Sequence, residues 1–196
     1  MDQNTAFEEL QFIKRVIEDS KRSIVYNGMH YIVWGILIIA GMLLNYYFLR
    51  QHIYFNYLYE WAAIVFIGWV FSFYYSKRLD KKGPKTFALK IIATVWLAAG
   101  VAMTILGFIG PLSGAISGSF ISPVLSVILG MAYLITGVIF ESRWFSWLSA
   151  GWWAGAVFMF YYPGIHTLFI MALLMLFFQT LPGIILYRKY NQQMAD

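Results

Sequence analysis

One carboxylate stands inside an apolar stretch of this chain. Residues 57–69 read YLYEWAAIVFIGW, and Glu60 is their only charged side chain. His52 precedes this stretch and His166 begins a later one, so all three side chains are expected near one boundary. Histidine changes charge near about pH 6.5 when unperturbed. Glu60, His52 and His166 are therefore our candidate proton-sensitive site. The plainer alternative is that Glu60 hydrogen-bonds a tyrosine or backbone group and only orients its helix.

Catalytic or metal chemistry is not indicated elsewhere in the sequence. The chain has no cysteine, which excludes disulfides, thiolate ligands and cysteine nucleophiles. Its histidines and acidic residues show no metal-ligand spacing, and no set of serine, histidine and aspartate converges. His30 is expected at the boundary opposite to His52 and His166, which does not suit a pair of facing haem ligands. We therefore predict a protein that is not an enzyme and holds no cofactor or metal.

The composition indicates a membrane protein. Of the 196 residues, 61% are hydrophobic and 12% are charged, about half the charged fraction of a soluble domain. Between Ile91 and Tyr187 the only charged residues are Glu141 and Arg143. A soluble fold needs a charged outer face that such runs cannot supply. The net charge of +5 comes from bases in loops beside apolar stretches, so the expected partner is membrane lipid and not nucleic acid.

Six stretches are long enough to cross a bilayer as helices. A helix needs about 20 apolar residues to span about 30 Å of hydrocarbon. The predicted spans cover about 28–49, 55–76, 86–109, 120–140, 144–163 and 165–187. The sequence therefore predicts an all-α polytopic membrane protein, with a six-helix bundle over residues 27–187 and a tail over residues 188–196.

The positive charges indicate the orientation of these spans. With the N-terminus in the cytosol, 13 of the 14 lysine and arginine residues fall inside and only Arg50 falls outside. Lysine and arginine collect on the cytoplasmic side of membrane proteins. Both termini are therefore predicted to be cytoplasmic, and Glu60, His52 and His166 are predicted to lie at the outer boundary.

Small residues recur on one face of the third, fourth and fifth spans. The pairs are seven or four residues apart: Gly100 and Gly107, Gly130 and Gly137, and Gly151 and Gly155. Such spacings let a neighbouring backbone approach one face of a helix closely. The neighbour is either another span of the same bundle or a second copy in a homo-oligomer. Packing within the bundle is the plainer explanation.

The sixth span contains a polar patch. Gln179 and Thr180 lie shortly before Pro182, and a proline inside a span leaves backbone groups that neighbours must satisfy. The patch could line a path through the bundle, or Pro182 could simply end the helix. We predict the second.

Residues 1–26 predict a cytoplasmic amphipathic helix. Thr5 and Glu8 fit a capping box, and an apolar stripe recurs at helical spacing: Phe7, Leu10, Ile13 and Ile17. From Thr5 to residue 26, four acidic residues balance four basic ones, so this helix lacks the positive charge of a lipid-attracted helix. The stripe either lies on the bundle or the membrane surface, or pairs with a protein partner or a second copy.

Residues 124–187 have a recognisable pattern. VLSVILGMAYLITGVIF is followed by WLSAGWWAGAVFMFYYPG and a final apolar span. This stretch resembles the HdeD-like acid-resistance membrane proteins of bacteria. The resemblance depends on Gly130, Gly137, Gly151 and Pro163. The first half departs from that pattern, because the first span ends NYYF without an outer proline. The resemblance implies a bacterial inner-membrane location and a link to stress, and it implies no catalytic residues.

Two functions are consistent with these features. The first is a non-enzymatic inner-membrane protein that serves as an interaction or membrane-stress component, with a response to external pH. The second is a small oligomeric channel or transporter with Glu60 in an outward-facing vestibule. A conduit needs a continuous polar lining, whereas the third to fifth spans offer little beyond Thr104, Ser126, Thr136 and Ser149. The sequence therefore favours the first.

Overall fold

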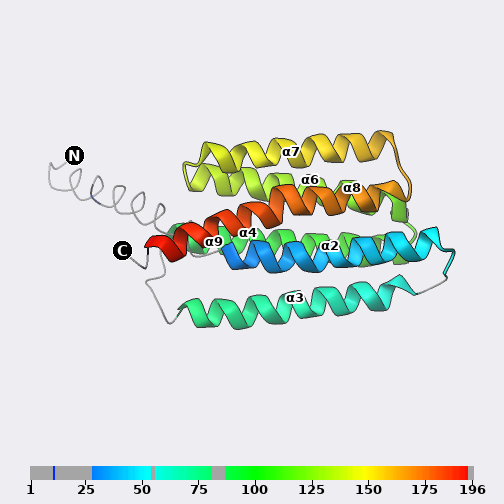
Figure 1. Cartoon of the computed structure of the whole chain (residues 1–196), viewed down its shortest axis with the longest axis horizontal. Coiled ribbons are helices and arrows are strands. Elements are labelled where there is room, and N and C mark those ends of the chain that lie inside the picture. The colour runs from blue at the N-terminus through cyan, green and yellow to red at the C-terminus, as the bar shows by residue number, and fades with distance from the viewer. Residues whose placement is uncertain (1–10, 12–27, 54–55, 81–86, 194–196) are drawn as a thin grey trace.

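The computed structural model describes residue 11 and residues 28–53, 56–80 and 87–193 (Figure 1). Gln11 is helical. The rest of the predicted amphipathic helix lies outside the described residues, including its stripe of Phe7, Leu10, Ile13 and Ile17. That helix and its partner face therefore stay predictions.

The described residues form helices joined by short turns, and they contain no strand. In chain order the elements are α2 (Gly28–Arg50), α3 (Tyr57–Asp80), α4 (Phe87–Thr104), η2 (Ile105–Ile109), α5 (Gly110–Leu112), α6 (Gly118–Ile139), α7 (Arg143–Tyr161), α8 (His166–Met175), η3 (Leu176–Thr180) and α9 (Leu181–Gln193). α4, η2 and α5 follow one another without a break, as do α8, η3 and α9. The predicted all-α class is confirmed for this part of the chain.

Within the described part of the chain, five helical segments are long and apolar enough to cross a membrane: Gly28–Arg50, Tyr57–Arg78, Phe87–Leu112, Gly118–Ile139 and His166–Lys189. They coincide with five of the predicted spans. α7, with 19 residues, is not among the five. Its sequence includes an arginine, two serines and four tryptophans, and tryptophan combines an apolar ring with a polar N–H. These residues lower the hydropathy of α7, although it is as regular a helix as its neighbours.

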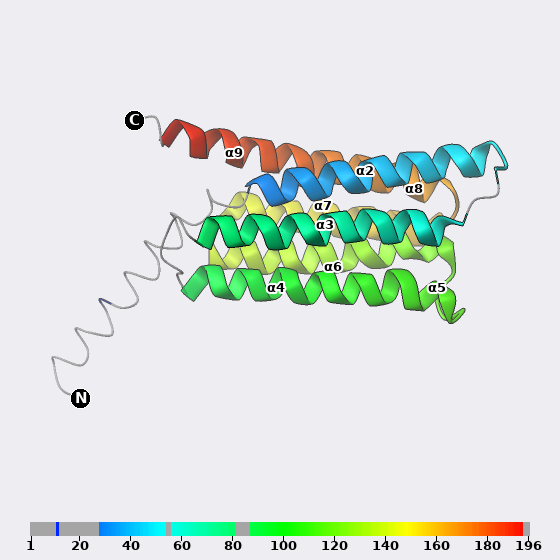
Figure 2. The same cartoon turned by 90° about the horizontal axis from the view of Figure 1, so that it is seen from below.

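The continuous helical segments are called rods here: α2, α3, α4 with η2 and α5, α6, α7, and α8 with η3 and α9. Successive rods of the bundle run in opposite directions (Figures 1 and 2). One end therefore holds the start of α2, α4 and α7 and the end of α3, α6 and α9. We call this the basic end, because the described residues there include Lys77, Arg78, Lys90, Arg143, Arg188 and Lys189. At the opposite end the described residues hold one basic side chain, Arg50.

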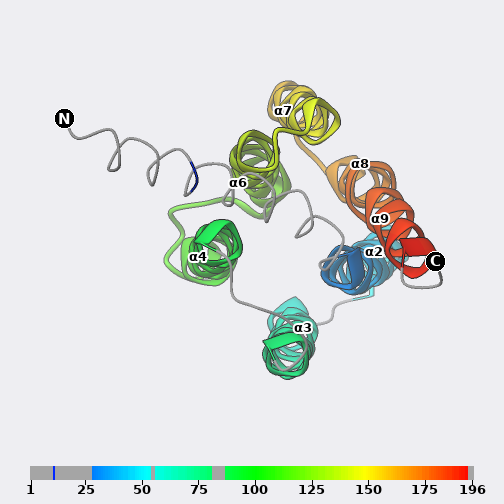
Figure 3. The same ribbon diagram turned by 90° about the vertical axis from the view of Figure 1, so that its left-hand side faces the viewer.

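The helices pack in pairs around a core of large side chains. α6 lies along α7, and α2 lies along α8 and α9. α4 packs on α6, and α3 packs on α2 (Figure 3). The core between them includes Tyr31, Leu129, Tyr133, Phe145, Trp152 and Met171. The outer faces expose many other apolar side chains, as membrane-spanning helices do.

Two rods contain a π-helical turn, and each turn precedes a proline. η2 is followed by Pro111 and η3 by Pro182. A proline ring clashes with the carbonyl four residues earlier and offers no N–H, and a wider turn relieves both problems. The prediction that Pro182 ends the last helix is wrong, because α9 contains Pro182 and continues to Gln193.

The backbones of α2 and α9 meet at two glycines. A Cβ placed on Gly28 would lie 2.7 Å from the carbonyl oxygen of Gly183 and 2.7 Å from the backbone nitrogen of Tyr187. Backbone atoms cannot swing aside as the end of a side chain can. The sequence analysis did not single out Gly28 or Gly183, although Gly28 and Gly35 share the seven-residue spacing of the glycines that it chose.

Candidate functional site

Glu60, His52 and His166 lie at the same end of the bundle, opposite to the basic end. Glu60 is in the first turn of α3, His52 follows the end of α2, and His166 begins α8. His52 and His166 are exposed. The Nε2 atom of His166 lies 2.6 Å from the carbonyl oxygen of Tyr162. The three side chains therefore come from three elements that meet at one end of the bundle.

The carboxylate of Glu60 is shielded from solvent. Neither of its oxygens has a hydrogen-bond partner among the described residues. Glu60 is therefore not hydrogen-bonded to His52 or His166 in the described structure. The plainer interpretation expected a hydrogen bond from Glu60 to a tyrosine or a backbone group, and the described residues contain no such bond either. An unpaired carboxylate in apolar surroundings is costly. Glu60 thus stays the candidate residue of this end, with its partner still to be assigned.

Five of the six predicted packing glycines face another helix of the same chain. A Cβ on Gly137 would meet the backbone of Phe145 and Ser146 in α7. A Cβ on any of four others would meet a side chain of another helix: Gly100, Gly130, Gly151 and Gly155. At Gly107 nothing lies within 4 Å of the Cβ position. The arrangement favours packing within the bundle at the five, and Gly107 alone of the set faces open space.

Gly137→Ala is expected to lower the unfolding temperature of the protein in detergent. The new methyl would lie 2.7 Å from the Ser146 nitrogen and 3.1 Å from the Phe145 carbonyl carbon, and overpacking a tight contact costs about 1–3 kcal/mol. Gly107→Ala is the matched control, because its methyl would enter open space. Circular dichroism against temperature measures both variants. Equal unfolding temperatures would contradict the close contact at Gly137.

An aromatic cluster fills the centre of the bundle around Tyr133 of α6. Its ring centroid lies 5.7 Å from that of Tyr31 in α2, 5.4 Å from that of Trp96 in α4 and 6.1 Å from that of Trp152 in α7. Phe145 stacks on the same ring at 5.7 Å. Tyr133 and Trp152 are both 0% exposed. Aromatic pairs at such separations stabilise a core beyond the area they bury, so this cluster ties four rods together.

Hydrogen bonds connect the cluster to the π-helical turn of the last rod. The hydroxyl of Tyr133 donates to Oε1 of Gln179 at 2.6 Å. Thr180 donates to the carbonyl oxygen of Met175, five residues earlier, at 3.0 Å. Both Gln179 and Thr180 are buried. The wide turn before Pro182 therefore presents two polar residues to the interior, where a side chain of α6 and the backbone of α8 satisfy them.

Sequence reasoning noticed Gln179 and Thr180 but missed the partner Tyr133. Tyr133 lies in an apolar span between Gly130 and Gly137, and nothing in its spacing distinguishes an inward tyrosine from one at the lipid boundary. The acceptor of the bond, Gln179, was the more informative residue. A glutamine at mid-span needs a partner inside the bundle, and Tyr133 is a hydroxyl donor in the adjoining apolar segment.

The Tyr133–Gln179 bond is expected to stabilise the bundle measurably. Tyr133→Phe keeps the stacked ring and removes the donor, while Gln179→Met keeps the volume and removes the acceptor. Each single change is expected to cost about 1–2 kcal/mol by leaving a buried polar group unpaired. The double variant is expected to cost less than the sum of the two. Unfolding in detergent measures this double-mutant cycle. Strictly additive costs would contradict the bond.

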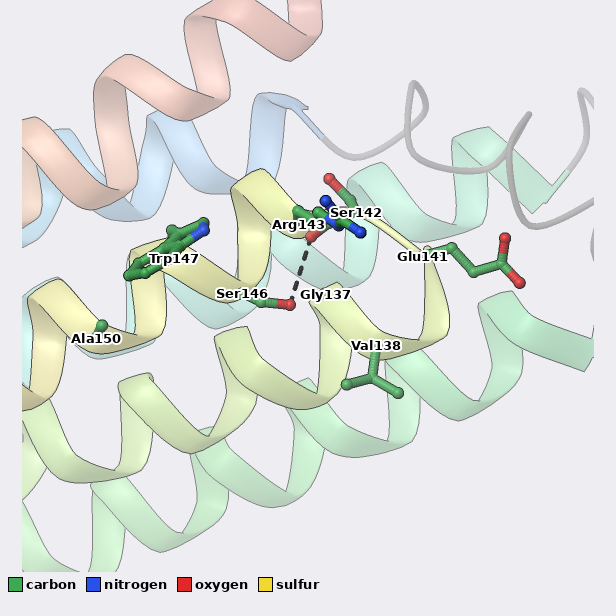
Figure 4. A pocket seen from close by; sticks show the side chains of 8 residues that line it. All are labelled: Gly137, Val138, Glu141, Ser142, Arg143, Ser146, Trp147 and Ala150. Atoms are coloured by element: carbon green, nitrogen blue, oxygen red, sulfur yellow. Dashed lines mark hydrogen bonds between the residues drawn. The ribbon is translucent and has the colours of Figure 1, made fainter.

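Among the residues that the structure describes, no group of three or more histidine, aspartate or glutamate side chains could hold a metal ion. A pocket of about 480 Å³ lies at the basic end, on the outer side of the turn between α6 and α7 (Figure 4). It contains the two charged residues that interrupt the sequence between Ile91 and Tyr187, namely Glu141 and Arg143. The pocket is remote from Glu60, which lies at the other end.

Comparisons with known proteins add no assignment. No family model, no curated protein and no solved structure matches this chain. The resemblance of residues 124–187 to the HdeD-like proteins therefore rests on the sequence pattern alone.

Proposed function

We propose that this chain is a non-enzymatic protein of the bacterial inner membrane that acts through its surfaces, as an interaction or membrane-stress component. The observation that carries the proposal is the filled interior. Tyr133, Trp152, Thr136 and Ser126 are fully buried where a conduit would need an opening. The HdeD-like pattern of residues 124–187 motivates the location and the link to stress.

Four hydroxyl side chains of the predicted third to fifth spans support this proposal, because each has a hydrogen-bond partner within the bundle. Ser126 donates to the sulfur of Met171, and Thr136 accepts from Trp96 while donating to the carbonyl oxygen of Ala132. Thr104 and Ser149 donate to carbonyl oxygens of their own helices. Groups that are satisfied in this way do not form a continuous polar lining in the described bundle.

The proposal includes six crossings with the basic end in the cytosol. The 19 residues of α7 make a helix of roughly 28 Å at 1.5 Å per residue, close to the hydrocarbon thickness of about 30 Å. α7 also lies along α6 and beside α8, which are both parts of spanning segments. The collection of lysine and arginine at the basic end supports the orientation.

Glu60 favours a second candidate function, a small oligomeric channel or transporter with an outward-facing vestibule. Its shielded carboxylate oxygens have no described partner, and ionisable side chains inside membranes often mark paths for ions or protons. The same residue is the candidate for a response to external pH in the leading proposal. A Glu60→Gln protein that kept such a response would remove Glu60 from that role.

Flux measurements distinguish the two functions. The purified protein is reconstituted into liposomes that enclose a pH-sensitive dye, and a pH gradient or a potassium gradient is imposed. The leading proposal predicts fluxes equal to those of empty liposomes, because the described interior has no polar path. Flux well above that background, lost in Glu60→Gln and kept in the surface control Lys77→Gln, would overturn it in favour of the channel.

A further inference from the structure

The pocket at the basic end has a polar side and an apolar side. Glu141, Ser142 and Arg143 line it at the turn, and Ser146 adds a hydroxyl one helical turn further on. The wall along α6 and α7 is completed by Gly137, Val138, Trp147 and Ala150. Val138 is 66% exposed and Trp147 is 74% exposed. Large apolar side chains with that exposure, beside spanning helices, indicate a surface that meets lipid.

The charges of the pocket do not neutralise each other. Glu141 and Arg143 flank Ser142, yet the described structure contains no ion pair between them, and Figure 4 shows the carboxylate of Glu141 directed away from the guanidinium of Arg143. Glu141 is held at φ +51°, a conformation that is uncommon outside glycine and redirects the chain. The turn thus presents one anionic and one cationic group at separate points of the same rim.

The depth of the lining matches the layers of a bilayer. Along α7, Trp147 lies roughly 6 Å and Ala150 roughly 10 Å beyond Arg143 at 1.5 Å per residue. The headgroup layer on each side of the hydrocarbon is about 5–7 Å thick. With Arg143 among the headgroups, Trp147 therefore stands at the boundary, where tryptophan is enriched, and Ala150 lies in the hydrocarbon. The pocket passes from headgroup depth to acyl-chain depth.

We propose that this pocket binds one phospholipid whose headgroup carries a phosphate and a primary ammonium. Arg143 binds the phosphate, in the charge-assisted geometry that guanidinium favours. Ser146 lies on the same side of the pocket, where its hydroxyl donates to the carbonyl oxygen of Ser142 at 3.4 Å (Figure 4), and no side chain caps the first turn of α7 in the described structure. Glu141 accepts hydrogen bonds from the ammonium. Trp147, Val138 and Ala150 contact the acyl chains.

Headgroup chemistry distinguishes this lipid from its competitors. A phosphatidylethanolamine ammonium has three N–H donors for Glu141, whereas the trimethylammonium of phosphatidylcholine has none. Phosphatidylglycerol has a phosphate for Arg143 but no cation for Glu141. A charge-assisted hydrogen bond is stronger than a neutral one, and a tenfold preference corresponds to about 1.4 kcal/mol. Retention of phosphatidylethanolamine is therefore expected to exceed that of the other two by about tenfold.

Native mass spectrometry of the full-length protein measures this preference. The protein is released from detergent in the presence of equal amounts of the dioleoyl forms of the three lipids, and the bound lipids are identified by mass. Arg143→Gln is expected to lower retention of all three. Glu141→Gln is expected to reduce phosphatidylethanolamine to the level of phosphatidylcholine and to leave phosphatidylcholine unchanged. Arg188→Gln is the matched control, because Arg188 is at the same end and is not among the residues that line the pocket.

Three results would overturn the site. Equal loss in Arg143→Gln and Arg188→Gln would mean that general positive charge attracts the lipid. A preference for phosphatidylglycerol that Glu141→Gln does not change would remove the role of the carboxylate. Displacement of phosphatidylethanolamine by inorganic phosphate would show that the apolar wall does not contribute. Circular dichroism confirms that each variant is folded, and Ala150→Trp, which fills the apolar side, is expected to lower retention of phosphatidylethanolamine without changing either charge.

Discussion

Helices inside hydrocarbon are not held together by the hydrophobic effect, because lipid tails are as apolar as the side chains they would replace. Close approach and internal hydrogen bonds must supply the attraction. In this bundle the backbones of two helices approach closely at glycines: α2 reaches α9 at Gly28 and Gly183, and the last turn of α6 reaches the start of α7 at Gly137. The Tyr133–Gln179 hydrogen bond joins α6 to the last rod, with each residue four positions before the contact glycine of its own segment, Gly137 or Gly183.

The same constraint explains the two wide turns. A proline inside a spanning helix removes a backbone donor, and the freed groups cannot turn to water. At Pro182 the chain widens into η3, and this turn places Gln179 and Thr180 inside the bundle. The irregular turn is therefore tied to the polar core, since a straight helix would direct these side chains differently. The interior that results is closed in its described part, which leaves the outer surface and the two ends of the bundle for function.

Helix positions could be predicted from the sequence, and the contacts between helices could not. Apolar runs of about 20 residues and the polar or glycine- and proline-containing breaks between them define the helices, because the thickness of hydrocarbon sets their length. The seven-residue glycine spacing singled out Gly130 and Gly137, whereas Gly28, which has the same spacing to Gly35 but begins its span, was not selected. Tyr133 was missed because tyrosine is common both at lipid boundaries and in cores. Glu60 was identified by its charge, yet its lack of a described partner depends on how α3 packs on α2, which periodicity does not determine.

The account depends on six crossings with the basic end in the cytosol, and α7 is the element that tests it. The chain has no cysteine, so single cysteines can be introduced at Ser142 before α7, at Ile165 after it, and at Ala115 in the turn before α6. A membrane-impermeant maleimide is then added to intact cells. Labelling of the cysteines at 115 and 165 with protection of the one at 142 is the predicted result. Labelling of 142 together with 165, or protection of both, would mean that α7 does not cross the membrane and that the bundle is not arranged as described.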